Sequence, residues 1–254
     1  MTPRRHGVDD PRRPLDQVAP VVPRKVPSTL PSPAPGISLW WWALERTAEE
    51  IEAASAVLSA VERVRAQRFG TAALRNRWIA GRSTLRTVLG DVLGTAPAAV
   101  EIRRGARGRP ELADRRAQID FNVSHTGDAA LVGIARGLPA RTRIGVDIER
   151  RDREVGVDRL ARKFLTGSER ATLLDLDLRA RRERFVRYWT CKEAMSKATG
   201  DGLIAPFGRL EVAEPDAPRL TGGPPPYVPA HWMLHAVALP DAWFATVAIW
   251  YAPE

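Results

Sequence analysis

The fold is decided by the stretch Phe185-Val-Arg-Tyr-Trp-Thr-Cys-Lys-Glu-Ala-Met-Ser-Lys197, which we predict to be helical. The stretch contains no proline, and Gly200 follows as a typical C-terminal cap. In such a helix Glu193 and Lys197 are four residues apart and share one face. The stretch therefore predicts a helix that presents a carboxylate and an ammonium group side by side.

Upstream of this helix, Ile144-Gly-Val-Asp-Ile-Glu149 is predicted to be a strand. Because side chains alternate along a strand, Asp147 and Glu149 lie on the same face. If strand and helix pack together, these two carboxylates meet Glu193 and Lys197. Three carboxylates suit a hard cation such as Mg²⁺, which keeps waters and takes further ligands from phosphates. The pattern predicts a metal-assisted phosphoryl-type transfer site, with Asp147, Glu149 and Glu193 as metal ligands.

The composition of the chain points to an anionic partner. The 254 residues carry a formal net charge of +9, and arginine supplies nearly all of the positive charge. Arginine matches phosphate oxygens with two parallel hydrogen bonds, so a nucleic acid, a phosphorylated small molecule or an acidic protein is predicted. For the bulk surface, a codon-biased genome that uses Arg in place of Lys is an equally good interpretation. The single cysteine, Cys191, excludes a disulfide within the chain, and we expect it to be a small buried side chain.

Neither a membrane span nor a secretory signal is evident. The chain has no run of roughly 18 apolar residues, and its basic N-terminus lacks an apolar segment. We expect a cytoplasmic protein.

The distribution of prolines and apolar residues divides the chain into three parts. Residues 1–36 hold nine of the 21 prolines with six basic and three acidic residues, and we predict a disordered basic leader. Residues 37–142 and 143–254 each show strands, then helices, then strands. We therefore expect an α+β fold of two similar α/β subdomains in a pseudo-twofold arrangement, with a cleft between them.

Several individual elements are also predicted. Capping boxes at Thr47 and Ser59 begin two helices, and long helices cover 72–93 and 178–199. Of the adjacent tryptophans 40–42, at least one must face a different side from the others. Strands are expected at 37–44, 100–103, 119–123, 129–135, 143–148, 208–212, 231–238 and 243–251.

Taken together, five motifs are specific in their order and spacing. They are Arg63-Val-Arg-Ala-Gln-Arg-Phe69, Gly108-Arg-Pro110, Phe121-Asn-Val-Ser-His-Thr126, Ile144-Gly-Val-Asp-Ile-Glu149 and Trp189-Thr-Cys-Lys-Glu-Ala-Met-Ser-Lys197. From residue 37 to the C-terminus the chain resembles the 4′-phosphopantetheinyl transferase superfamily. It is most similar to the larger two-halved type, which activates carrier proteins of polyketide, nonribosomal-peptide and fatty-acid synthesis. Residues 1–36 have no counterpart in the family pattern.

The resemblance implies a reaction. Such enzymes move the phosphopantetheine arm of coenzyme A onto a serine of an apo acyl or peptidyl carrier protein and release 3′,5′-ADP, assisted by Mg²⁺. By similarity, Asp147 and Glu193 hold the metal, and Glu149 is a further ligand that some members lack. The same motif makes Glu193 the proposed general base and Lys197 a contact to phosphate.

The resemblance also implies how coenzyme A, the co-substrate, is held. The residues at matching positions are Arg65, Arg77, Arg109, Ser124, His125, Lys192 and Lys197. Arg109 stands where the family often carries Lys, and it keeps the positive charge. Glu62 is an acid where some relatives place a base near the nucleotide.

Partners follow from the same resemblance. We expect a helical carrier protein with an acidic face that contacts Phe164, Leu165 and the 166–185 segment, and a monomeric enzyme without nucleic acid or membrane partners. Three alternatives stay open. They are a basic nucleic-acid-binding protein, a non-catalytic coenzyme A-binding relative and a Mg²⁺-dependent hydrolase of diphosphate-linked metabolites.

Overall fold

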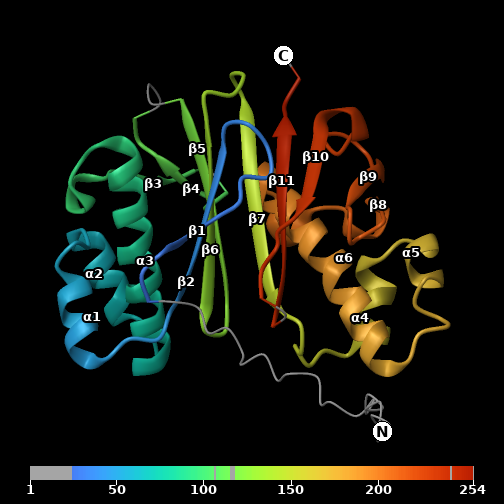
Figure 1. Cartoon of the computed structure of the whole chain (residues 1–254), viewed down its shortest axis with the longest axis horizontal. Helices are drawn as coiled ribbons and strands as arrows, with labels where there is room; N and C mark the ends of the chain where they lie inside the picture. Colours follow the sequence, from blue (N-terminus) through green and yellow to red (C-terminus); the bar gives the residue numbers. More distant parts are fainter. Residues whose placement is uncertain (1–24, 106, 115–117, 241, 254) are drawn as a thin grey trace, which may run out of the picture.

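Two antiparallel sheets face each other at the centre of the molecule, and helices cover the outer side of each sheet (Figure 1). The computed structural model describes residues 25–253 apart from 106, 115–117 and 241. The four-stranded sheet has the order β1 (Ser28–Leu30), β2 (Ile37–Ala43), β6 (Ala129–Arg136) and β5 (Ile119–Thr126). The three-stranded sheet has the order β10 (Trp232–Ala236), β11 (Trp243–Tyr251) and β7 (Thr142–Arg150).

The helices form the two outer layers (Figure 1). On the four-stranded sheet lie α1 (Ala48–Ser55), α2 (Ala60–Gln67) and α3 (Ala72–Leu93). On the three-stranded sheet lie α4 (Val157–Phe164), α5 (Gly167–Ala171) and α6 (Leu178–Thr199). Smaller elements are the strand pairs β3 (Ile102–Arg104) with β4 (Pro110–Leu112) and β8 (Glu211–Ala213) with β9 (Arg219–Gly222), and the 3₁₀ turns η1 (Pro97–Ala99), η3 (Gly202–Ile204), η4 (Phe207–Arg209) and η5 (Pro229–His231).

Side-chain alternation along β2 builds two cores at once. Ile37, Leu39 and Trp41 point into the core between the sheets, where they meet residues of β7 and β11. Trp40 and Trp42 point the other way, into the core under α1–α3. A further core lies between α4–α6 and the three-stranded sheet. The expected division of the tryptophans between two layers and the predicted α+β class are both confirmed.

The edge strands β5 and β7 belong to different sheets, yet side chains join them. Alternate polar residues of β5 point at the edge of β7 and replace a backbone ladder there. They accept hydrogen bonds from consecutive outward-facing N–H groups, which satisfies those buried donors. The pairs are Asp120 with Ile144 at 2.8 Å, Asn122 with Val146 at 3.0 Å and Ser124 with Ile148 at 3.3 Å.

Helix starts and ends follow the sequence closely. Thr47 and Ser59 form complete capping boxes with Glu50 and Glu62, as predicted. The long helix α6 ends at Gly200, whose φ of 81° is in the left-handed region that favours glycine. In the described chain, no helix is both long and apolar enough to cross a membrane.

The structure departs from prediction at the start of the chain. Residues 1–24 of the predicted leader lie outside the described residues, but Ser28–Leu30 form β1 and pair with β2, Thr29 opposite Trp40. The prediction of disorder up to residue 36 is therefore wrong for this part, because the edge of β2 offers backbone partners that composition does not reveal. The boundary between halves at 142 and 143 stays a prediction.

Candidate active site

The close packing of α6 on β7 creates the site. Gly145 faces α6, and a Cβ at this position would lie 1.9 Å from the carbonyl oxygen of Ala194 and 2.6 Å from the amide nitrogen of Ala198. Only glycine permits this approach. Since Asp147 lies two residues further along the same face of β7, the approach brings it to the helix turn that carries Lys197.

A buried hydrogen-bonded group of three side chains lies at this junction. Asp147 is only 3% exposed, and its Oδ1 accepts from Ser124 Oγ at 2.8 Å and from Lys197 Nζ at 2.6 Å. Lys197 Nζ also donates to Ser124 Oγ at 2.7 Å. We call Ser124, Asp147 and Lys197 the Asp147 cluster. It brings together three of the predicted site residues, one from each of β5, β7 and α6.

Glu149 lies next to this cluster on β7, as the alternation predicted. Its Oε2 accepts from Thr126 Oγ1 at 3.0 Å, and its Oε1 pairs with Arg153. Burial raises the pKa of Glu149, and the negative charge of Asp147 raises it further, while Arg153 acts in the opposite direction. The carboxyl group of Glu149 thus lies close enough to the carboxylate of Asp147 for the two negative charges to repel each other.

Glu193 is the most perturbed carboxyl group of the site. Burial raises its pKa to about 7, Asp147 and Glu149 contribute in the same direction, and Lys197 opposes them. Three carboxyl groups therefore act on one another electrostatically from β7 and α6. A carboxyl group with a pKa near neutrality can exchange a proton at physiological pH.

The fit of these residues to a metal ion can be tested on their donor atoms. Asp147 Oδ2 is buried and has no hydrogen-bond partner among the described residues, which leaves a carboxylate oxygen for a further ligand. Oxygen donors of this kind suit Mg²⁺. In the described part of the chain, however, no three Asp, Glu, His or Cys side chains are gathered closely enough to hold a metal ion. The carboxylate oxygens of Asp147, Glu149 and Glu193 are donor atoms that suit Mg²⁺. Their joint coordination of one ion stays a prediction.

His125 lies beside the cluster and is exposed. Desolvation of the ring lowers the pKa of His125, and the positive charge of Lys197 lowers it further, while Asp147 acts in the opposite direction. Its predicted contact with coenzyme A stays a prediction.

Arg109 is placed differently from a free phosphate ligand. Its guanidinium is buried, pairs with both oxygens of Asp120 at 2.9 and 2.7 Å, and donates to the carbonyl oxygens of Ile144 at 2.7 Å and Lys197 at 3.0 Å. Four of the five guanidinium N–H groups are used by these bonds. The expectation of a direct coenzyme A contact is not met in this arrangement, because Arg109 ties α6 to β5 and β7.

Lys192 was also expected to bind coenzyme A, and the structure contradicts this. The residue is 0% exposed, and its Nζ donates to Glu169 and to two backbone carbonyl groups. All three ammonium donors are therefore used inside the protein. Lys192 points away from the Asp147 cluster because adjacent helical residues project about 100° apart.

Arg65 and Arg77 lie on the outer helices α2 and α3, on the far side of the four-stranded sheet from β7 (Figure 1). Both are exposed, and Arg65 stacks over the ring of Trp78 at 5.5 Å. No hydrogen bond or ion pair in the described chain joins either arginine to the Asp147 cluster. Their contact with coenzyme A stays a prediction.

The structure explains why an acidic residue, Glu62, stands at position 62. It is 6% exposed and pairs with the half-buried Arg82, and with the buried Arg86 through Nε at 2.7 Å, so it neutralises these two arginines instead of facing a nucleotide. Burial alone would raise the pKa of Glu62, but hydrogen bonds from Arg86 and Ser59 and the charge of Arg82 lower it on balance.

Sequence reasoning missed Asp120, Asn122 and Thr126 as site-building residues. The signal was present, since polar residues occupy every second position of β5 from 120 to 126. In an otherwise apolar sheet, such alternation indicates a strand edge that makes side-chain hydrogen bonds. Cys191 is buried as predicted, and burial raises the pKa of its thiol to about 12.

Comparisons with known proteins identify a family. The family described as the 4′-phosphopantetheinyl transferase superfamily matches residues 143–248, and the family described as 4′-phosphopantetheinyl transferase, N-terminal, matches residues 42–136. The 4′-phosphopantetheinyl transferase HetI of a Nostoc species is 37% identical over 179 residues, which cover 70% of this chain and 73% of that protein. A putative 4′-phosphopantetheinyl transferase of a Synechocystis species is 33% identical over 63% of each chain.

Among solved structures, a holo-(acyl-carrier-protein) synthase from Bacillus anthracis aligns with a TM-score of 0.36 and 24% identity over 44% of this chain and 96% of its own. The sequence matches extend over both halves of the chain, and one relative is more than 30% identical over more than two thirds of its length. The chain therefore belongs to the 4′-phosphopantetheinyl transferase superfamily, and to its larger, two-halved type.

Proposed function

We propose that this protein transfers the 4′-phosphopantetheine arm of coenzyme A to a serine of an apo acyl or peptidyl carrier protein and releases 3′,5′-ADP. One observation carries the proposal. A buried Asp147 shares its Oδ1 with Lys197 and Ser124, beside Glu193 with a pKa of about 7. This combination of anion, cation and proton acceptor is what transfer from a diphosphate requires.

In the proposed step, the serine hydroxyl of the carrier protein attacks the β-phosphorus of coenzyme A. A new oxygen–phosphorus bond forms, and the bond to the leaving 3′,5′-ADP breaks. Glu193 accepts the serine proton, for which its raised pKa is suitable. Lys197 is proposed to offset the negative charge that develops on the leaving oxygen.

Asp147, Glu149 and Glu193 would hold the Mg²⁺ ion. When bound, this ion neutralises the diphosphate and polarises its phosphorus–oxygen bonds. Glu193 cannot easily be both a tightly held ligand and a strong base, so its two proposed roles require separate tests. Ser124 and His125 are proposed to contact the nucleotide phosphate, with Arg65 and Arg77 as further basic contacts.

The carrier protein is proposed to dock near the 166–185 segment. Leu165 cannot supply the contact as expected, since it is 1% exposed, whereas Phe164 is only partly buried against the core and stays a proposed contact. Leu174 and Leu178 are the large apolar side chains exposed here, at 72% and 79%. The net positive charge of the chain would attract a carrier protein with an acidic face.

The test is an intact-mass assay with purified apo carrier protein, coenzyme A and MgCl₂. We expect the carrier protein to gain the mass of one phosphopantetheine, and Asp147→Ala or a chelator to abolish this gain. Coenzyme A binding without any gain across several carrier proteins contradicts the transfer and favours a non-catalytic relative. Failure to bind coenzyme A, with tight and salt-sensitive retention on heparin, favours the nucleic-acid alternative.

A further inference from the structure

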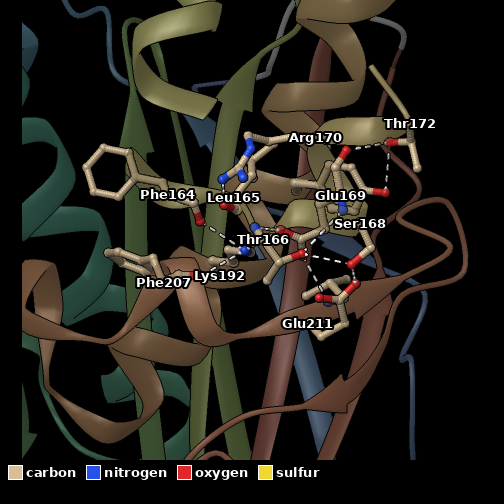
Figure 2. Close-up of polar contacts among 12 residues, drawn as sticks. Phe164, Leu165, Thr166, Ser168, Glu169, Arg170, Thr172, Lys192, Phe207 and Glu211 are labelled. Atoms are coloured by element: carbon tan, nitrogen blue, oxygen red, sulfur yellow. Dashed lines mark hydrogen bonds and ion pairs between the residues drawn. The ribbon is translucent and has the colours of Figure 1, made fainter. Parts of the chain in front are cut away.

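Lys192 and Glu169 form a fully buried ion pair behind the active-site turn of α6 (Figure 2). Lys192 Nζ lies 2.5 Å from Glu169 Oε2 and donates to the carbonyl oxygens of Phe164 at 2.9 Å and Phe207 at 2.8 Å. The lysine is 0% exposed and the glutamate 1%. One ammonium group thus joins α6 to the end of α4, to α5 and to η4.

Glu169 extends the connection to further elements. Its Oε2 accepts from the backbone N–H of Thr166 at 2.9 Å, as part of the capping box that begins α5. Its Oε1 accepts from the backbone N–H of Val212 in β8 at 2.9 Å. Since both carboxylate oxygens are used, the position of Glu169 is fixed from three sides, and Lys192 is held against a fixed anchor.

Three aromatic rings pack against one another here, and two of them belong to residues whose carbonyl groups accept from Lys192. The ring of Phe164 lies 5.0 Å from that of Trp189 and 5.6 Å from that of Phe207, and Trp189 and Phe207 are 5.7 Å apart. The ammonium group itself is out of contact with water, since Lys192 is 0% exposed. In such surroundings each hydrogen bond is strong and its geometry is specific.

The opposite face of the same helix turn is held against the strands. Gly145 contacts the backbone at Ala194, and Thr190 Oγ1 lies 3.1 Å from Thr246 Oγ1 of β11. One turn later, Arg109 Nε donates to the carbonyl oxygen of Lys197. Contacts on both faces therefore determine how α6 is rotated about its axis, and with it the direction of Glu193.

We propose that Lys192 and Glu169 are a positioning pair, which holds the α6 turn in the rotation that directs Glu193 and Lys197 toward Asp147. The inference rests on the proposed function of Glu193. The pair does not touch the reacting groups, and it acts through the backbone of the adjacent residue. A small rotation of the turn would displace both active-site side chains, and a misplacement of about 1 Å can cost about 10²-fold in rate.

A pair of variants separates positioning from stability. Lys192→Met leaves Glu169 buried and unpaired, whereas the double variant Lys192→Met with Glu169→Leu replaces the ion pair with apolar side chains. Replacing both members of a buried ion pair often costs less stability than removing one, although Glu169→Leu here also removes the acceptors of the Thr166 and Val212 N–H groups. The control is Arg219→Met with Glu214→Leu, which removes an exposed pair of the same half, 64% and 63% exposed.

Three experiments are made on each variant: urea unfolding for the midpoint, steady-state kinetics for kcat and KM of coenzyme A, and hydrogen exchange of the amides of residues 190–197. We expect the double variant to fold with a lowered urea midpoint, because the N–H groups of Thr166 and Val212 lose their acceptors. Under conditions in which it is fully folded, it should lose at least about 10-fold in kcat with little change in KM, as for a misplaced catalytic group. Its α6 amides should exchange faster than those of the control, which should match the wild type.

If Lys192→Met lowers both kcat and the unfolding midpoint and the double variant restores both together, the proposal is overturned. The pair would then only stabilise the fold. If the double variant does not fold, Glu169→Gln, which keeps the shape and an acceptor oxygen for Lys192, takes its place. A fall in kcat at constant KM supports positioning, and unchanged kcat contradicts it. If the wild type itself transfers nothing, the proposed function fails, and hydrogen exchange of α6 decides the positioning claim alone.

Discussion

Gly145 lies so close to Ala194 that a Cβ on the glycine would be 1.9 Å from the carbonyl oxygen of the alanine. The contact is between backbones, so no side-chain rotation can relieve it. It explains why a glycine stands two residues before Asp147 in the strand motif. The helix that carries Glu193 and Lys197 is brought to the strand that carries Asp147 at this one contact.

Gly145→Ala should therefore displace α6. We expect a loss of unfolding free energy of about 1–3 kcal/mol or more, typical of overpacking, together with a larger loss of transfer rate. Urea unfolding and the intact-mass assay measure the two effects. Gly156→Ala is the matched control, since a Cβ at Gly156 meets nothing within 4 Å. Equal behaviour of the two variants would contradict the role given to the close approach.

Glu193→Gln tests the proton acceptor. The amide keeps the shape of the side chain but cannot take a proton, so we expect transfer to fall by about 10²–10⁴-fold. Coenzyme A binding, measured by calorimetry, should remain. Turnover close to that of the wild type would remove Glu193 from the proposed base role and leave it only as a candidate metal ligand.

Asp147→Asn tests the metal site without relying on activity. We expect MgCl₂ to raise the thermal midpoint of the wild type, because a ligand that binds only the folded state stabilises it. The shift should vanish in Asp147→Asn and in the presence of a chelator. Asp152→Asn, at an exposed ion pair with Arg150, should keep the shift. An equal shift in both variants would place the ion elsewhere.

Glu62→Gln tests the buried pairing with Arg82 and Arg86. Breaking a buried pair on one side costs about 3–5 kcal/mol at neutral pH. The pKa of Glu62 is lowered in the folded state, so its stabilisation is present above the unfolded pKa of about 4.3 and is lost as pH falls through the folded value. The difference from the wild type should thus shrink in acid, as measured by urea unfolding from pH 7 to pH 3. Glu214→Gln, at an exposed pair, should change little at any pH.

Arg109→Lys separates a structural from a ligand-binding arginine. Lysine keeps the charge but cannot form the paired bonds to Asp120, so we expect a loss of at least about 2 kcal/mol in unfolding free energy. Coenzyme A affinity should change little. Unchanged stability with weakened coenzyme A binding would instead return Arg109 to the phosphate contacts that the family resemblance implies.

Sequence-based prediction of the site was best where the repeat of one helix or strand alone determines which side chains share a face. Asp147 and Glu149 share a face because strands alternate, and Lys197 reaches this face because helical residues four apart coincide. Both patterns are local and independent of the rest of the fold. Long helices with good caps were predictable for the same reason.

Lys192 shows why other roles could not be predicted. A lysine beside Glu193 in a mostly polar helix gives no sign of which face is buried. Its partner, Glu169, lies 23 residues upstream, in the capping box that begins α5. Burial of the pair depends on the packing of α4, α5 and η4, which no local pattern contains. The pairing of Arg109 with Asp120, on the other side of α6, likewise depends on packing between elements and has no local sequence pattern.

The bonds between β5 and β7 have a consequence for exchanging parts between relatives. The side chains of Asp120, Asn122 and Ser124 accept hydrogen bonds from N–H groups of β7 at every second residue. If β5 slipped by one residue along β7, the apolar side chains of Phe121 and Val123 would face these N–H groups instead. The register that places Ser124 beside Asp147 therefore depends on the residues of both strands. A chimaera assembled from two relatives should keep its active site only if β5 and β7 are inherited from the same parent, even when the crossover falls in the loop between the halves.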